Sequence, residues 1–289
     1  MCICRQGLAA VLVCSLAMGA DAARASAAQF QTGGDASLGY DDNIGNAGSS
    51  SEEEAAGFAS ATLNADFLTG LSNKASLLLR GSFSGEGYSR FSRLSNGKAG
   101  AMLRLSWRPD GGFYVPTVGF STSAAYRKFG SRLRDSGEYR ASLFLDEQIT
   151  TSISTRLTAQ ASRRVAAGKV FDLSGSSLAL DLDCALGPAF AVYGGYQFHY
   201  GDQVSTGSPT PARLAAAEAM APDDAFGGSA ANRFAYRMPA HTQIATLGFN
   251  YALSHRYALD AQFQAVQSKA GFGNRYGHAI TVVSLLARF

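Results

Sequence analysis

The stretch His278-Ala-Ile-Thr-Val-Val-Ser-Leu-Leu-Ala-Arg-Phe289 closes the chain and has the alternating pattern of a β-strand. Successive side chains of a strand point to opposite faces of the sheet. One face carries a run of residues that ends in an aromatic ring, namely Thr281, Val283, Leu285, Ala287 and Phe289. The other face is nearly as apolar, through Ile280, Val282 and Leu286, which predicts a packed interior beside this strand.

An alternating strand that ends in a C-terminal aromatic resembles the closing strand and assembly signal of bacterial outer-membrane β-barrels. The resemblance implies that Phe289 faces lipid and is recognised by the barrel-assembly machinery during biogenesis. It also implies an integral protein of the bacterial outer membrane, in contact with membrane lipid and lipopolysaccharide.

Residues 1–27 have the features of a secretory signal peptide. Arg5 supplies a positive charge, an apolar run covers residues 7–20, and the small residues Ala25-Ser26-Ala27 predict cleavage before Ala28. We therefore expect an exported protein whose barrel domain covers residues 28–289.

The cysteines exclude a fold held together by disulfides. Cys2, Cys4 and Cys14 lie in the predicted signal peptide, so only Cys184 remains and an intrachain disulfide is impossible. A lipoprotein anchored at Cys14 is an alternative, although the preceding Val13 is bulkier than lipoprotein processing usually accepts. The net charge of +3 gives no indication of nucleic-acid binding.

The rest of the chain repeats one unit, in which about ten alternating residues precede a turn or a loop. In residues 57–68, Leu63 and Phe67 lie on one face while Asn64 and Asp66 lie on the other. A period of two with charges on one face only is what a sheet between lipid and a lumen requires. The pattern predicts strands at residues 34–42, 57–68, 74–86, 97–108, 113–126, 138–149, 154–163, 175–185, 189–200, 242–251, 256–266 and 277–289.

The predicted connections are alternately short and long, as expected for periplasmic turns and extracellular loops. Pairing of the last strand with the first would leave no open edge in the bilayer. The predicted fold class is therefore all-β: a transmembrane, antiparallel, up-and-down β-barrel of about 12 strands. A soluble β-sandwich is the alternative.

Aromatic side chains are predicted to form a girdle at each membrane interface, because their amphipathic rings prefer headgroup depth. The periplasmic girdle comprises Phe67, Trp107, Tyr114, Tyr251, Tyr257 and Phe289, and the outer girdle comprises Tyr126, Tyr139, Phe198 and Tyr200. Two girdles favour a membrane barrel over a β-sandwich.

The segment Ala36-Ser-Leu-Gly-Tyr-Asp-Asp-Asn-Ile-Gly-Asn-Ala47 resembles the first strand and loop of the barrel domain of surface-lipoprotein assembly modifiers. Residues 87–94 and 126–129 are similar in style to the outer loops of such barrels. The resemblance implies a stand-alone barrel of that broad type, for which a structural or assembly role without conductance is one possible function.

The sequence predicts no catalytic residues and no cofactor. None of the four histidines is followed two positions later by a serine, as the chemistry of an outer-membrane phospholipase would require. A hydrolase at the rim, of the aspartyl-protease type, would need Asp41 and Asp42 close to His199 and Asp202, and it stays an alternative.

An ion-pair cluster is predicted at the periplasmic end of the lumen. Folding the strands about their connections brings Arg156 level with Asp181 and Asp183 on one side and with Asp146 on the other. The two aspartates of the eighth strand lie too far from His199 to share a metal ion, so no metal site is predicted.

Arg80, Arg104, Arg127 and Arg140 are predicted to line a path for anions through the lumen. Arg80 and Arg104 become near neighbours when their strands pair, and Asp66 is expected to lie several residues away from them. Guanidinium groups stay charged and bind carboxylate or sulfate with two hydrogen bonds. Pairing with lumen or loop carboxylates, and binding of lipopolysaccharide phosphates by loop arginines, are the alternatives.

The connection at residues 201–240 is long enough to constrict a pore. Thr210 and Pro211 predict a helix N-terminus, residues 212–220 favour a helix, and Pro222 would end it. A gate and a mobile loop without a gating role remain open alternatives.

We predict a passive, porin-like channel with some preference for small anionic solutes. An assembly barrel without conductance and a rim hydrolase are the other two candidate functions. The identity of the solute and the oligomeric state stay open at this point.

Overall fold

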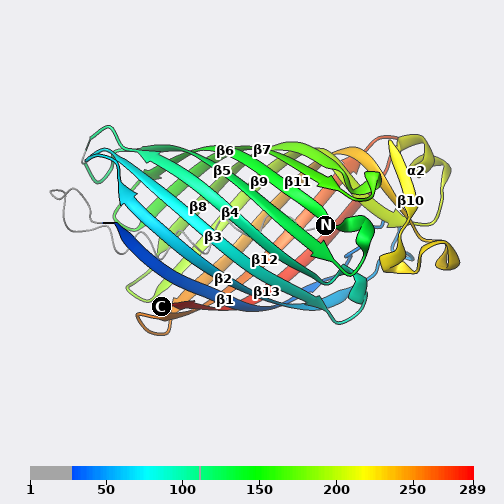
Figure 1. The fold of residues 1–289 in the computed structure, drawn as a ribbon, viewed down its shortest axis with the longest axis horizontal. Helices are drawn as coiled ribbons and strands as arrows, with labels where there is room; N and C mark the ends of the chain where they lie inside the picture. Colours follow the sequence, from blue (N-terminus) through cyan, green and yellow to red (C-terminus); the bar gives the residue numbers. More distant parts are fainter. Residues whose placement is uncertain (1–27, 111) are drawn as a thin grey trace.

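The computed structural model describes residues 28–110 and 112–289. These residues form one antiparallel sheet of thirteen strands; β10 (Ala219–Pro222) lies beyond the rim, and the other strands close into a barrel (Figure 1). The predicted fold class is confirmed. The predicted signal peptide, residues 1–27, lies outside the described residues.

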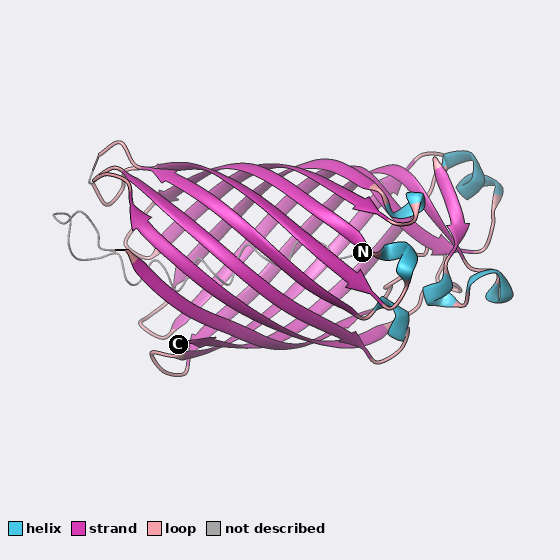
Figure 2. Ribbon diagram, in the orientation of Figure 1, coloured by secondary structure: helices cyan, strands magenta, loops and turns pink. Residues whose placement is uncertain are grey.

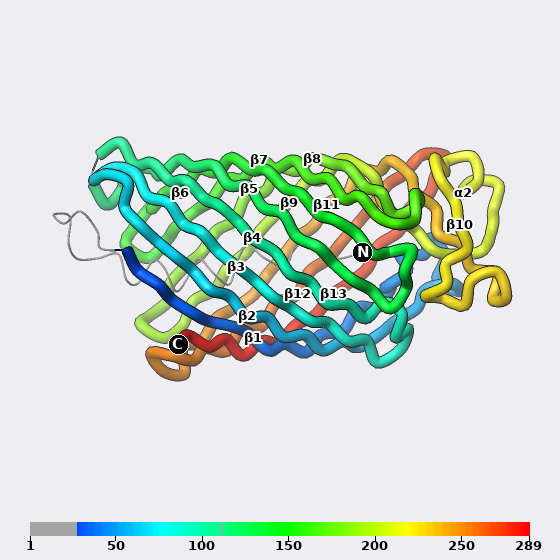
Figure 3. Tube along the Cα trace, viewed as in Figure 1, coloured from blue at the N-terminus to red at the C-terminus, as the bar shows by residue number. Residues whose placement is uncertain are grey.

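The strands of the wall follow one another around the barrel in chain order, tilted against its axis (Figure 3). They are β1 Gln29–Asp41, β2 Ala56–Gly70, β3 Ala75–Tyr88, β4 Asn96–Trp107, β5 Thr117–Phe129, β6 Ser136–Gln148, β7 Ile153–Ala166, β8 Leu173–Ala185, β9 Phe190–Gly207, β11 Phe234–Ala252, β12 Tyr257–Ala270 and β13 Arg275–Arg288. Each predicted strand overlaps one of these.

The barrel closes between its first and last strands. β1 pairs with β13 from Gly33 opposite Arg288 to Asp41 opposite Ile280. Next to this ladder, the backbone N–H of Phe289 donates to a carbonyl oxygen of β1 at 2.9 Å. Closure removes the open strand edges that a bilayer could not satisfy.

The two faces of the wall differ as the alternation predicts. More than half of the side chain is exposed at several outward apolar positions, among them Leu38, Leu63, Phe83, Leu143 and Leu247. The residues of both predicted aromatic girdles are exposed as well. On the inward face of β13, Val282 is only 2 % exposed, so the interior beside this strand is packed at that level.

Short connections gather at one end of the barrel, the turn end, and long ones at the other, the loop end (Figure 2). The C-terminus lies at the turn end (Figure 1). The loop end carries the helical segments, which are η1 Ser92–Leu94, η2 Arg132–Arg134, η3 Lys169–Phe171, α2 Pro211–Ala216, η4 Asp224–Phe226 and η5 Gly228–Ala231. None of the helices in the described part of the chain is long and apolar enough to span a membrane.

Several predicted boundaries are wrong. β9 continues to Gly207 and β11 begins at Phe234, because the outer ends of these strands pair with each other beyond the rim. The predicted helix at 212–220 ends with α2, since the chain then extends and forms β10 against β11. The predicted fifth strand begins four residues later, at Thr117, because a turn precedes it.

Candidate functional site

The connection between β9 and β11, residues 208–233, crosses the loop end of the barrel, and we call it the lid. The fully buried carboxylate of Asp223 accepts a hydrogen bond from Nη2 of Arg134 at 2.6 Å. The neighbouring Asp224 accepts one from Arg93 at 2.9 Å. These partners belong to the connections β5–β6 and β3–β4, so the lid is tied to loops across the mouth from its own strands.

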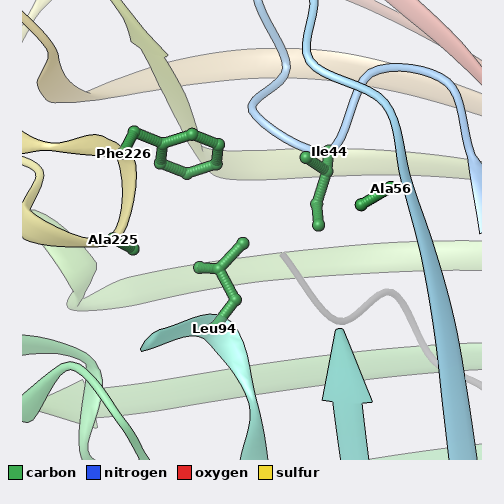
Figure 4. Close-up of a cluster of buried hydrophobic side chains, with 5 residues drawn as sticks. All are labelled: Ile44, Ala56, Leu94, Ala225 and Phe226. Carbon is green, nitrogen blue, oxygen red and sulfur yellow. The ribbon is translucent and has the colours of Figure 1, made fainter. Parts of the chain in front are cut away.

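The underside of the lid is apolar. Phe226 packs in one buried cluster with Ile44, Ala56 and Leu94, which come from the first two long loops and the rim of β2 (Figure 4). The ring of Phe91 lies beside that of Phe226, with 4.7 Å between the centroids. Burial of these side chains holds the lid on the mouth through the hydrophobic effect.

The helix α2 anchors the other half of the lid. Its N-terminus is capped by Thr210, whose side chain accepts from the backbone N–H of Arg213. The end of the helix packs on the lumen face of the outer strand ends, against Tyr236, Met238 and Tyr276. The short helix that the sequence predicts is therefore folded onto the mouth.

Arg213 and Glu52 connect the lid to the first long loop. Their side chains form an ion pair of 2.6 Å, and both are largely buried. Burial raises the pKa of the Glu52 carboxyl, but the hydrogen bonds from Arg213 and from the backbone of Ser208 outweigh it and lower the pKa to about 2.

A basic cluster lies in the lumen beneath the lid. The carboxylate of Glu138 on β6 contacts four cations: Lys98 at 2.9 Å, Arg127 at 3.1 Å, Arg140 at 3.4 Å and Arg164 at 2.6 Å. The four cations lie on β4, β5, β6 and β7, whose register puts them at one level of the wall. Because four cations share one carboxylate, the cluster carries net positive charge.

The predicted surroundings of Arg80 are wrong. Asp66 is directly opposite Arg80 in the β2–β3 register, and the two side chains form two hydrogen bonds of 2.6 Å each. Asp66 therefore does not lie several residues away, and Arg80 belongs to a neutral pair.

Arg104 is positioned by an aromatic ring. Its guanidinium lies over Phe144, 4.9 Å from the ring centroid, and Arg156 lies over the same ring at 5.4 Å. The ring occupies the place that a Cβ atom at Gly119 would need, since such an atom would come within 2.1 Å of it. The glycine thus allows the ring to lie flat against the wall.

The predicted acidic neighbours of Arg156 are found in its vicinity. Its guanidinium forms two hydrogen bonds with Asp146, one of them 2.7 Å long. Asp181 is directly opposite Arg156 in the β7–β8 register, and Asp183 is one inward position further along β8. Within the described part of the chain, Asp146 is the one of the three carboxylates that bonds to Arg156, so the structure brings together a pair with two carboxylates nearby.

The remaining inward carboxylates lie mainly on strands that carry few cations. They are Asp35, Asp41, Asp181, Asp183 and Asp260, on β1, β8 and β12, and Glu86 on β3. The hydroxyl of Tyr193 donates to Asp260 at 3.1 Å. The basic cluster and these carboxylates thus lie mainly on different strands of the wall.

The constellation of a rim hydrolase is not assembled. Asp41 lies 3.0 Å from Nδ1 of His278, on the adjacent strand, and not beside His199. Asp202 accepts hydrogen bonds from Ser174 at the rim. Among the described residues, no group of three or more histidine, cysteine or acidic side chains could hold a metal ion.

Sequence reasoning missed Lys98, Glu138 and Arg164 as members of the site. The predicted seventh strand ends at residue 163, which puts Arg164 in the loop that follows, whereas β7 continues to Ala166. The signal was present, because Arg156, Ser162 and Arg164 share the parity of an inward face.

The chain matches no protein-family model and no curated protein. Its fold is similar to that of an outer-membrane channel from Pseudomonas putida, with a TM-score of 0.60 and 10 % identity over 90 % of this chain and 95 % of that chain. The NanC porin gives a TM-score of 0.49 with 8 % identity over 89 % and 100 % of the chains. The KdgM porin in complex with oligogalacturonate gives 0.44 with 11 % identity over 89 % and 99 %.

The similarity to the Pseudomonas putida channel shows the fold of an outer-membrane β-barrel and, at 10 % identity, the fold alone. The resemblance of the first strand to the lipoprotein assembly modifiers stays a prediction.

Proposed function

We propose that the protein is a porin-like channel of the bacterial outer membrane that passes small solutes passively and favours anions. The basic cluster around Glu138 is the observation that carries the proposal, because it places several cations where a solute would enter the lumen. In the proposed orientation, the loop end faces the outside of the cell and the turn end faces the periplasm, because extracellular loops are long and periplasmic turns are short.

We attribute the preference for anions to the place of the cations along the lumen and not to the total charge of the lumen. The cations of the cluster lie beneath the mouth, while the carboxylates Asp181, Asp183 and Asp260 lie on other strands nearer the turn end. An anion entering from outside would therefore meet guanidinium groups first, and these bind carboxylate or phosphate with two hydrogen bonds. Arg104 would extend the path inward.

Lipid and lipopolysaccharide are the proposed surroundings. The exposed apolar face would contact lipid, and exposed loop arginines such as Arg90 and Arg93 are placed to meet lipopolysaccharide phosphates. Phe289, exposed on the outward face at the turn end, is proposed as the signal read by the barrel-assembly machinery.

A barrel without conductance is a second candidate function. The observation that favours it is the lid, whose ion pairs and apolar underside hold it across the mouth. For the channel, the lid must be displaced at least transiently; for a structural barrel, it would stay in place.

Planar-bilayer recordings of the refolded protein distinguish these functions. We expect ionic current in the wild type and a chloride-to-potassium permeability ratio above one. Replacing Arg104 and Arg127 by Gln should move the ratio toward one, and replacing the exposed, outward-facing Lys128 by Gln should leave it unchanged. Absence of current from correctly folded protein would overturn the channel.

A further inference from the structure

A cavity of about 120 Å³ lies inside the loop end, next to the basic cluster. One side of it is basic, with Arg140 and Arg164 held by Glu138. The other side is polar, and it is lined by Gln197, His199, Gln203 and Thr242 from β9 and β11, together with Asp202, whose carboxylate accepts hydrogen bonds from Ser174. The cavity thus joins two kinds of chemistry along one stretch of wall.

The basic side retains capacity to bind an anion. Arg140 and Arg164 share the single carboxylate of Glu138, so this side of the cavity has one negative charge against two positive ones. A guanidinium group has five N–H donors, more than the one contact that each makes with Glu138 uses. A carboxylate in the cavity would meet donors in the planar geometry that it prefers.

The side of the cavity formed by β9 and β11 presents a buried hydrogen-bond acceptor. Gln203 is 4 % exposed, and its amide nitrogen donates to Oγ1 of Thr242 at 3.0 Å. The amide oxygen of Gln203 has no hydrogen-bond partner among the described residues. Buried acceptors are normally satisfied, and Gln203 lines the cavity, so a donor from a ligand held there would give this oxygen the partner it lacks.

Further hydrogen-bonding groups continue from Gln203 along the neighbouring strands. Thr242 is linked to Ser268 on β12 by a hydroxyl contact of 2.8 Å. Gln203 and Thr242, which line the cavity, therefore suit a ligand that carries hydroxyl groups.

We propose that this cavity is a binding site for a small hydroxycarboxylate, with the carboxylate on Arg140 and Arg164 and a hydroxyl donating to Gln203. The proposal deepens the proposed anion preference and rests on it for its role in transport. A solute held at this site would pass the lumen in a saturable manner.

Other ligands of similar size satisfy only half of the site. An inorganic anion or an unsubstituted carboxylate would use the arginines and leave the oxygen of Gln203 open, while a neutral polyol would leave the positive charge uncompensated. The cavity is also smaller than the roughly 300–1,000 Å³ of sites for drug-sized ligands, which favours a molecule of a few carbons.

Three probes of equal carbon number separate these possibilities. D-glycerate carries a carboxylate and two hydroxyls, propionate only the carboxylate, and glycerol only hydroxyls. Ligand-observed NMR titrations of the full-length barrel in detergent should show D-glycerate binding at least about fivefold more tightly than either comparator, a difference of about 1 kcal/mol. Equal affinity of D-glycerate and propionate would overturn the site.

Single-residue variants test the two halves of the site separately. Gln203→Leu should abolish the preference for D-glycerate over propionate, whereas Arg140→Gln should weaken both carboxylates. Gln264→Leu, at an inward glutamine that does not line the cavity, is the matched control and should change neither. A difference in SDS-gel mobility between heated and unheated samples would verify that each variant is folded. An unchanged preference in a folded Gln203→Leu barrel would refute the proposed hydroxyl contact.

The proposed binding site and the proposed channel can be refuted independently of each other. Preferential binding of D-glycerate to a barrel that carries no current would support the site and overturn the channel. Current without that preference would support the channel and overturn the site.

Discussion

Arg134 and Asp223 form a buried ion pair that fastens the lid to the β5–β6 loop. Nη2 of Arg134 lies 2.6 Å from Oδ2 of Asp223, and the aspartate side chain has no exposed surface. The same carboxylate oxygen also accepts from Thr206 at 2.7 Å. The pair thus joins three parts of the loop end that are distant in the sequence.

Asp223→Ala should release the lid. Removing one partner of a buried pair leaves the other charge uncompensated, at a cost of about 3–5 kcal/mol. We expect trypsin to cleave the lid at Arg213 and Arg233 much faster than in the wild type, while the barrel wall stays resistant. Asp110→Ala, at an exposed turn on the other end, is the control. Equal cleavage rates in wild type and Asp223→Ala would show that the pair does not hold the lid.

Acid should loosen the lid through Glu52. The pKa of this carboxyl is about 2 in the folded protein against an ordinary value of 4.5, so its ion pair with Arg213 is fully stabilising above about pH 4.5. As the pH falls through about 2, the carboxylate is protonated and this contribution is lost. Pepsin cleavage of the lid should therefore accelerate over this range.

Glu52→Gln provides the reference for that experiment, because glutamine does not titrate. At pH 4.5 and above the wild-type lid should be cleaved more slowly than the variant lid, and near pH 2 the two rates should converge. A constant ratio of the two rates across this range would contradict the assigned role of Glu52.

Replacing Asp66 and Arg80 should show whether the selectivity of the channel depends on the net charge of this pair or on Arg80 itself. Asp66→Asn combined with Arg80→Gln removes one charge of each sign, so the permeability ratio of the channel should stay unchanged. Arg80→Gln alone leaves Asp66 uncompensated in the lumen and should shift the ratio toward cations. A large shift in the double variant would mean that Arg80 contributes to selectivity in spite of its partner.

Two glycines offer a matched test of wall packing. An added Cβ at Gly119 would collide with the ring of Phe144, whereas an added Cβ at Gly81 meets nothing within 4 Å. We expect Gly119→Ala to destabilise the barrel by about 1–3 kcal/mol through overpacking and to displace Arg104 with the ring. Urea unfolding in lipid vesicles measures the difference. Equal unfolding midpoints for Gly119→Ala and Gly81→Ala would refute the packing role of the glycine.

The wall was predictable because one strong pattern is repeated along it. Alternation of apolar and polar residues is imposed by lipid on one side and a lumen on the other, so it locates strands such as β2 within a few residues. The same alternation correctly paired Arg156 with Asp146, since the β6–β7 turn is short and its position well marked.

The register of the strands and the packing of the loops were harder to predict from the sequence. In the β2–β3 hairpin the turn lies at residues 71–74, and the pairing differs from the predicted one by a small displacement that is enough to bring Asp66 opposite Arg80. The ion pair of Arg134 with Asp223 joins loops that have no periodic pattern and are far apart in the chain. Alternation contains no information about such contacts, because they depend on tertiary packing.

The zero-current potential of the wild-type protein, recorded in a planar bilayer across a potassium chloride gradient, tests the proposed anion-preferring channel most directly. We predict steady current after insertion and a potential whose sign reports preferential permeation of chloride. A potential that reports preferential permeation of potassium, or the absence of any current from folded and inserted protein, would contradict it.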